Sequence, residues 1–159
     1  MSRTRLLTIA SALVAVTAAG GVTSGAGARS RAKADHGTAA VATTPLTSGA
    51  IQYVAGFDSD AILGHAAITY VIKAVPTSAK GTFSLVARNV VLYDGTGELS
   101  GTATAKLTAS AGGIATVTAG KLILNSGKGS LAGHKLAASF SGTGHLGGGY
   151  TFTYHGTYR

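Results

Sequence analysis

Apolar and polar side chains alternate along most of the chain after residue 50. The last ten residues, YTFTYHGTYR, place the rings of Tyr150, Phe152, Tyr154 and Tyr158 on one face and mainly threonines on the other. The segment ELSGTATAKL, residues 98–107, alternates as regularly. A period of two is typical of β-strands with one buried face, whereas no segment here keeps a 3.6-residue apolar period without an interrupting glycine. We therefore predict an all-β fold with little helix.

The same pattern predicts five more strands, over residues 51–57, 62–75, 81–93, 114–124 and 130–141. One of them contains VARNVVLY, whose apolar residues fall on both faces, which indicates a strand covered on both sides or a bulge. Glycine-rich segments separate the strands: DGTG at 94–97, SAGG at 110–113, NSGKG at 125–129 and LGGG at 146–149. Glycine adopts the positive φ that tight hairpins require, so successive strands should be antiparallel neighbours.

The strands and turns together account for residues 50–159, which we predict to be a single domain. An antiparallel sheet with open edges invites aggregation, and a closed barrel removes those edges. We predict one antiparallel β-barrel of about eight strands, with a β-sandwich as the alternative.

A glycine frame, Gly-x-Gly-x-Leu-x-Gly, occurs three times, as GTGELSG at 95–101, GKGSLAG at 127–133 and GTGHLGG at 142–148. Phosphate-binding loops require a helix directly after the glycines, but strand periodicity follows here. We interpret the repeats as turns, in which the first two glycines reverse the chain, the leucine enters the core and the third glycine permits a bend.

The segments LYDGTGELSGTATAKL and GKLILNSGKGSLAGHKLAASFSGTG resemble the barrel-like family that includes allene oxide cyclases and plant dirigent proteins. In that family a Gly-x-Gly-x-aromatic/Leu-x-Gly element recurs before a core strand, and the resemblance covers residues 80–159. It implies an eight-stranded antiparallel barrel whose apolar cavity binds a hydrophobic or phenolic small molecule, and some members steer a cyclisation or coupling. The family's catalytic polar residues have no matching positions here, so the resemblance carries over no activity.

Residues 1–28 are typical of a signal peptide. The basic MSRTR precedes the apolar LLTIASALVAVTAA, which is shorter than the roughly twenty residues of a membrane span. The small residues Ala26–Ala28 predict cleavage after Ala28, with an uncleaved anchor as the alternative. Residues 29–49 show no apolar period and are rich in Ala, Thr and Ser, which predicts a flexible leader. We expect the mature chain to be secreted or extracellular, or to lie in the cell envelope, with no membrane span.

The formal net charge of +8 is not spread evenly along the chain. Five of the thirteen Lys and Arg lie before position 34, whereas from Asp35 onward eight Lys and Arg face five Asp and Glu. These later cations are scattered rather than clustered, so we predict no nucleic-acid binding. The absence of cysteine excludes disulfides and thiolate metal sites, so packing and hydrogen bonds must stabilise the fold.

Candidate chemistry is sparse. The five histidines share no His-x-His or His-x-x-x-His spacing, so we predict no metal site, and nothing in the sequence indicates a cofactor or catalytic residues. Asp58, Asp60 and Asp94 are interpreted as turn formers, while paired carboxylates for acid–base chemistry stay open. The candidate ligand-binding residues, near one barrel mouth, are Arg88, Tyr93 and Glu98. Their alternative role is a surface Arg–Glu pair across neighbouring strands.

The function depends on the barrel interior, because eight strands enclose a lumen that either side chains or one small ligand fill. Inward Ala and Gly, as in SGTATAKL, would underfill the lumen or permit a narrow, closed barrel. We expect a secreted module that binds a small hydrophobic molecule. The alternatives are a cyclase- or isomerase-like enzyme and a structural or adhesive envelope protein with a solid core. A transmembrane barrel would suit the aromatic last strand, but aromatic girdles are missing elsewhere. The sequence leaves oligomerisation open.

Overall fold

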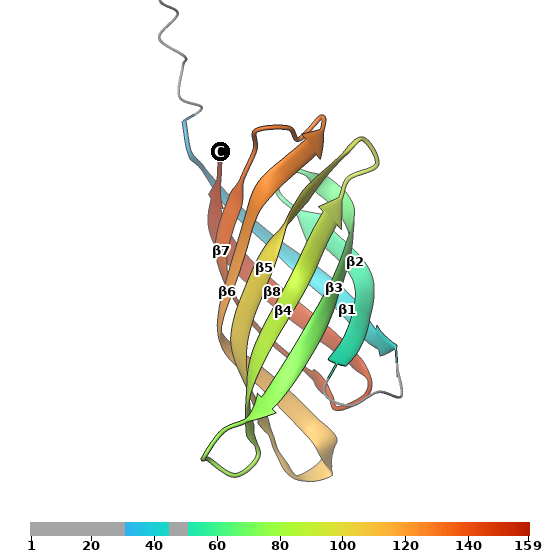
Figure 1. The fold of residues 1–159 in the computed structure, drawn as a ribbon, viewed down its shortest axis with the longest axis vertical. Helices are drawn as coiled ribbons and strands as arrows, with labels where there is room; N and C mark the ends of the chain where they lie inside the picture. Colours follow the sequence, from blue (N-terminus) through green and yellow to red (C-terminus); the bar gives the residue numbers. More distant parts are fainter. Residues whose placement is uncertain (1–30, 45–50) are drawn as a thin grey trace, which may run out of the picture.

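The computed structural model describes residues 31–44 and 51–159, which form a closed antiparallel barrel of eight strands (Figure 1). The strands are β1 (Lys33–Thr44), β2 (Ile51–Asp60), β3 (Gly64–Pro76), β4 (Thr82–Tyr93), β5 (Gly97–Ala109), β6 (Ile114–Gly129), β7 (Leu136–His145) and β8 (Gly149–Tyr158). Each strand pairs with the next along the chain, and β8 pairs with β1, so no strand is left as an edge. The predicted all-β barrel is confirmed, and the β-sandwich alternative is wrong.

The first strand corrects the predicted domain boundary. β1 lies within residues 29–49, which we predicted to be a flexible leader, so the barrel begins at Lys33 and not at residue 50. The inward, buried positions of this strand are Asp35, Gly37, Ala39 and Val41. Their period is two, but a search for large apolar side chains misses it. The predicted signal peptide, residues 1–28, and its cleavage after Ala28 lie outside the described residues.

A β-bulge interrupts β4 within VARNVVLY, which confirms one of the two predicted alternatives. The register with β5 shifts between Ala87 and Val90, and Asn89 takes a positive φ of 52°. Both Arg88 and Asn89 are consequently exposed, and the alternation resumes with the buried Val90. The apolar residues on both faces of this segment therefore arise from a change of phase along the strand.

The repeat leucines do not share one environment. Leu99 and Leu131 are buried in the core, as predicted for the first two repeats. Leu146 of the third repeat lies in the exposed β7–β8 hairpin with 51% of its surface accessible, so the predicted core position is wrong there. The turn predicted at residues 125–129 lies later in the chain. Those residues belong to β6, and the connection to β7 covers residues 130–135.

Several glycines inside the strands make room for aromatic rings. A Cβ on Gly142 would collide with Phe152, and a Cβ on Gly144 would collide with Tyr150, both on the neighbouring β8. The ring of Phe140 likewise covers Gly120. Glycine beneath an aromatic ring is a known device for curving a barrel wall without leaving a void.

The two ends of the barrel differ in packing. The upper end in Figure 1 carries the C-terminus and the β2–β3, β4–β5 and β6–β7 connections, and the lower end carries the β3–β4, β5–β6 and β7–β8 connections. The largest fully buried apolar side chains of the upper half are Leu92, Leu99, Leu124 and Leu136. Below them a second buried cluster contains Leu85, Leu107 and Val117 together with the smaller Ala105 and Ala115.

Candidate functional site: carboxyl groups inside the barrel

Two adjoining cavities occupy the lumen. The middle cavity has a volume of about 70 Å³, and the lower cavity, of about 210 Å³, reaches the β7–β8 hairpin at Leu146 and Gly147. Side chains that line both cavities are Tyr70, Ile72, Leu85, Val117 and Phe152. The walls are mostly aliphatic and aromatic, and Asp58 and Tyr154 are among the residues that border the middle cavity.

Three carboxyl groups are buried at the upper end of the lumen. Asp35 on β1 and Asp58 and Asp60 on β2 are 3%, 2% and 5% exposed. We interpreted Asp58 and Asp60 as turn formers, and this is correct only for Asp60, whose Oδ1 accepts hydrogen bonds from the backbone N–H groups of Ile62 and Leu63 at 2.7 Å each. Asp58 lies two residues earlier on the same face of β2, and it points inward instead.

Tyr154 on β8 joins two of these carboxyl groups. Its hydroxyl lies 2.9 Å from Asp58 Oδ2 and 2.5 Å from Asp60 Oδ2. The ring reaches β2 by crossing β1 at Gly37, which is paired in register with Asp60 on one side and with Tyr154 on the other. A Cβ at position 37 would collide with the hydroxyl end of the ring. Gly37 is therefore required for the contact between Tyr154 and the carboxyl groups.

Two oxygens of this cluster are buried without a hydrogen-bond donor: Asp58 Oδ1 and Asp35 Oδ2. The other oxygen of Asp35 accepts a bond from the backbone N–H of His36 at 2.9 Å. Asp35 Oδ2 gains a partner when one proton is shared with the neighbouring carboxyl of Asp60, which is among the groups that raise its pKa. Asp58 Oδ1 is different, because Asp58 is the acid that borders the middle cavity. Asp58 is therefore the acid of the cluster that lies beside the cavity.

Burial dominates the protonation of the cluster. Desolvation raises the pKa of Asp58 to about 6, with the charge of Asp60 acting in the same direction and the Tyr154 hydrogen bond opposing both. Desolvation, followed by the charge of Asp60, raises the pKa of Asp35 to about 6. The pKa of Tyr154 is also raised, first by burial and then by its bond to Asp60, so the phenol keeps its proton. That single proton serves two carboxyl groups. Protonated Asp58 completes the chain by donating to the Tyr154 oxygen while Tyr154 donates to Asp60.

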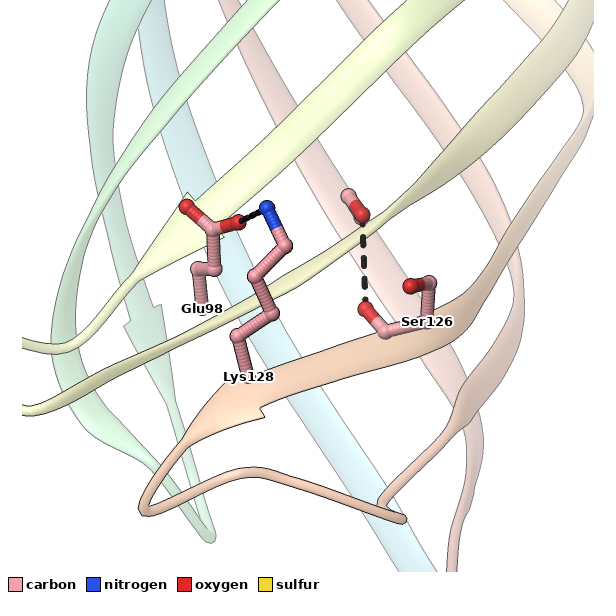
Figure 2. A network of polar contacts seen from close by, with 4 residues as sticks. Glu98, Ser126 and Lys128 are labelled. Atoms are coloured by element: carbon pink, nitrogen blue, oxygen red, sulfur yellow. Dashed lines mark hydrogen bonds and ion pairs between the residues drawn. The ribbon is translucent and has the colours of Figure 1, made fainter.

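The predicted ligand-binding residues lie on the outer wall. Arg88 is exposed in the β4 bulge, and Tyr93, 48% exposed, donates a hydrogen bond from its hydroxyl to the Gly95 carbonyl at 2.9 Å. Glu98 is the register partner of Tyr93, and its carboxylate forms an ion pair with Lys128 at 2.6 Å (Figure 2). None of the three predicted residues lines either cavity. The cation beside Glu98 is thus a lysine of β6 and not Arg88.

A second cross-strand contact accompanies this ion pair on the same two strands. The hydroxyl of Ser100 donates to the Ser126 carbonyl at 3.3 Å. Figure 2 shows Ser126 beside Glu98 and Lys128. Because the side chain of Lys128 is 71% accessible, solvent screens the pair strongly. These contacts connect β5 to β6 at the surface and do not reach the lumen.

The described part of the chain offers no metal centre, since no three His, Cys, Asp or Glu residues within it are arranged to hold an ion. The same residues contain no helix long and apolar enough to cross a membrane. No family model, curated protein or solved structure matches the chain. The resemblance to allene oxide cyclases and dirigent proteins consequently stays a prediction, and the lumen itself supplies the evidence on function.

Proposed function

We propose that this protein is an exported β-barrel that binds one small, mainly apolar molecule in its lumen. The observation that carries the proposal is the pair of adjoining apolar cavities, which is bordered by Asp58, a buried acid with one oxygen that has no hydrogen-bond partner. Small-molecule sites combine these features, an apolar wall and few polar groups that fix orientation. Export rests on the basic and apolar pattern of residues 1–28, and the eight-stranded barrel agrees with the architecture that the family resemblance implies.

The cavity volumes limit the size of the ligand. Drug-sized pockets begin near roughly 300 Å³, and an apolar cavity of roughly 150 Å³ accommodates benzene. The lower cavity, at about 210 Å³, therefore suits a single ring with a short substituent that extends into the middle cavity of about 70 Å³. Leu146 and Gly147 border the lower cavity from the exposed β7–β8 hairpin, so this end is the entrance.

We expect toluene to bind in the lumen and a larger side chain at Ala87 to weaken its binding. Ala87 is buried and borders the middle cavity, so Ala87→Leu would fill that space and leave only the lower cavity for the ligand, whereas Ala137→Leu adds the same atoms to an exposed position on β7. Amide NMR spectra recorded during a toluene titration should show saturable shifts at Val117 and Phe152 in the native protein and in the Ala137 variant. The Ala87 variant should reach saturation only at a higher toluene concentration.

Two results would contradict lumen binding. One is the absence of saturable shifts in the native protein with toluene, benzyl alcohol and benzylamine alike. The other is an unchanged response in a folded Ala87→Leu protein. If Ala87→Leu does not fold, Ala103→Val narrows the same cavity by a smaller volume and replaces it in the comparison.

A second candidate function, an isomerase-like activity, is favoured by the Asp58–Tyr154–Asp60 hydrogen-bond chain. A carboxyl group whose pKa lies near the operating pH is suited to general acid–base catalysis, and Asp58 borders the cavity. Such an activity would remove a carbon-bound proton from a ligand and return one from solvent. We expect deuterium from D2O to enter a bound ring ketone only if this candidate is correct, and Asp58→Asn to stop that exchange.

A further inference from the structure

The lumen concentrates negative charge without a buried cation to balance it. The three buried charged side chains of the described residues are all carboxyl groups, Asp35, Asp58 and Asp60. The ion pair found in this part of the chain, Lys128 with Glu98, lies on the outer wall. An ionised carboxylate buried away from water is unfavourable unless a cation or hydrogen-bond donors compensate it. The donors at the cluster are the Tyr154 hydroxyl and backbone N–H groups, among them that of Ser59, which lowers the pKa of Asp58. Asp58 Oδ1 nevertheless makes no hydrogen bond.

We propose that the lumen selects a small apolar amine in its protonated form, with the ammonium group on Asp58 Oδ1 and the apolar body in the two cavities. This inference rests on the proposed function, because it names the chemical class of the molecule that the lumen binds.

The carboxyl group of Asp58 is held in a fixed orientation with one oxygen free. Its Oδ2 contacts the Tyr154 hydroxyl, and that hydroxyl also contacts Asp60 Oδ2. Asp60 is fixed in turn by the backbone N–H groups of Ile62 and Leu63. A chain of bonds thus connects the β2–β3 turn to Asp58 and leaves Oδ1 as its oxygen without a hydrogen-bond partner. An ammonium group has three donors and no acceptor, so it complements this arrangement directly.

Neighbouring charges strengthen the preference for a cation. Asp60 and Asp35 belong to the same buried cluster, and their coupling raises the pKa of Asp35. Within an apolar wall the effective dielectric is low, so these charges attract a cation and repel an anion more strongly than they would in water. A neutral hydroxyl ligand would satisfy the free oxygen with one hydrogen bond but would leave the charge uncompensated. The structure therefore ranks amine above alcohol, and alcohol above carboxylate.

Benzylamine, benzyl alcohol, toluene and benzoate test this ranking, because they share one ring and differ in the substituent. We expect titration calorimetry at pH 7.5 to show benzylamine binding about tenfold or more tighter than benzyl alcohol, as for a hydrogen bond that gains a charge. Asp58→Asn keeps an acceptor for Tyr154 but removes the charge. It should abolish the preference and change the benzyl alcohol affinity by less than about twofold. The control is Glu98→Gln, which removes a carboxylate from the outer wall and should retain the preference.

A pH series on the native protein tests the same inference without a variant. The titratable groups that face Asp58 are Asp60 on β2 and Tyr154 on β8, with Asp35 of β1 in the same cluster. Because the pKa of Asp58 is raised to about 6, its charge is lost as the pH falls through that value. The affinity for benzylamine should fall between pH 7.5 and pH 5, whereas the affinity for toluene should not change.

The outcomes separate this inference from the proposed function. If toluene and benzyl alcohol bind as tightly as benzylamine, the amine inference is overturned and lumen binding stands. If none of the ring compounds binds, both proposals are overturned. If benzylamine keeps its preference in a folded Asp58→Asn protein, Asp58 does not bind the ammonium group and the inference fails.

Discussion

A single glycine decides whether the carboxyl groups of the lumen meet a hydrogen-bond donor. Gly37 stands between β2 and β8 at the level where Asp60 and Tyr154 face one another across β1. Any side chain at this position would occupy the space of the phenol, and Tyr154 would lose its contacts with Asp58 and Asp60. The absence of a side chain at one residue is thus a condition for the geometry of the whole cluster.

Tyr154→Phe should destabilise the barrel by about 1–3 kcal/mol, the usual cost of leaving buried acceptors without their donor. The variant keeps the ring over Gly37 but removes the hydroxyl from Asp58 Oδ2 and Asp60 Oδ2. Urea unfolding at pH 7 measures the loss. The matched control is Tyr93→Phe, whose hydroxyl is exposed and binds a turn carbonyl, and we expect a change of less than about 0.5 kcal/mol. Equal losses in the two variants would contradict the structural role of Tyr154.

At the scale of strands, prediction succeeded where apolar and polar residues contrast strongly. The alternation in β5 and β8 is carried by Leu or aromatic residues against Thr, and both strands were predicted within three residues of their ends. β1 was missed because its inward side consists of Asp, Gly, Ala and Val. The pattern of burial is as regular there as in β8, but small and charged residues conceal it.

Only part of the candidate site could be predicted from the sequence. Asp58 and Asp60 stand two residues apart, which on a strand places both on one face, so the spacing held a usable signal. Their association with Asp35 and Tyr154 depends on the pairing of β1 with both β2 and β8. The pairing of β1 with β8 follows from closure of the barrel, and the pairing of β1 with β2 involves a strand that was not predicted, so neither has a counterpart in the sequence around the two aspartates. An aspartate that forms a turn and an aspartate that points into the barrel can therefore be distinguished only when the strand order is known.

The repeat leucines provide a prediction at this scale. Leu131→Ala should cost about 2–5 kcal/mol, because Leu131 lies in the β6–β7 connection and is buried in the core at the upper end of the barrel. Leu146→Ala in the equivalent place of the third repeat should change stability by less than about 0.5 kcal/mol, since that side chain is half exposed. Thermal and urea unfolding would measure both. Similar losses would mean that the three repeats share one packing role, contrary to the structure.

At the scale of the whole molecule, the barrel combines one well-packed end with one hollow end. The upper half holds the fully buried leucines and the carboxyl cluster, and the lower half holds the larger cavity. The chain has no cysteine, so no disulfide compensates for the unfilled volume or for the buried acids. The unfilled volume and the buried acids therefore lower the stability of the barrel at the positions that a ligand would occupy. The protonation state of these acids becomes one of the quantities that determine the free energy of unfolding.

The barrel should lose stability relative to an Asp58→Asn variant as the pH rises from 4 to 7. Folding raises the pKa of Asp58 from its ordinary value of 3.8 to about 6, so in this range the folded state binds more protons than the unfolded state. The stabilisation is complete below about pH 4 and is lost as the pH rises through 6. A shift of this size corresponds to about 3 kcal/mol. Asp35 contributes in the same direction, and the two contributions are not additive because both depend on Asp60.

Melting temperatures measured from pH 4 to pH 7 provide the comparison. General charge repulsion at low pH affects the native protein and Asp58→Asn alike, so the difference between them isolates the titration of Asp58. Asp94→Asn serves as a control. Backbone N–H groups of Thr96 and Gly97 lower the pKa of Asp94 below its ordinary value of 3.8, so the stability that this residue adds is lost only below that pH and should be nearly constant from pH 4 to pH 7. A difference between native protein and Asp58→Asn that stays constant from pH 4 to pH 7 would show that Asp58 is not buried as an acid in the lumen. The buried carboxylate on which amine selection depends would then be missing.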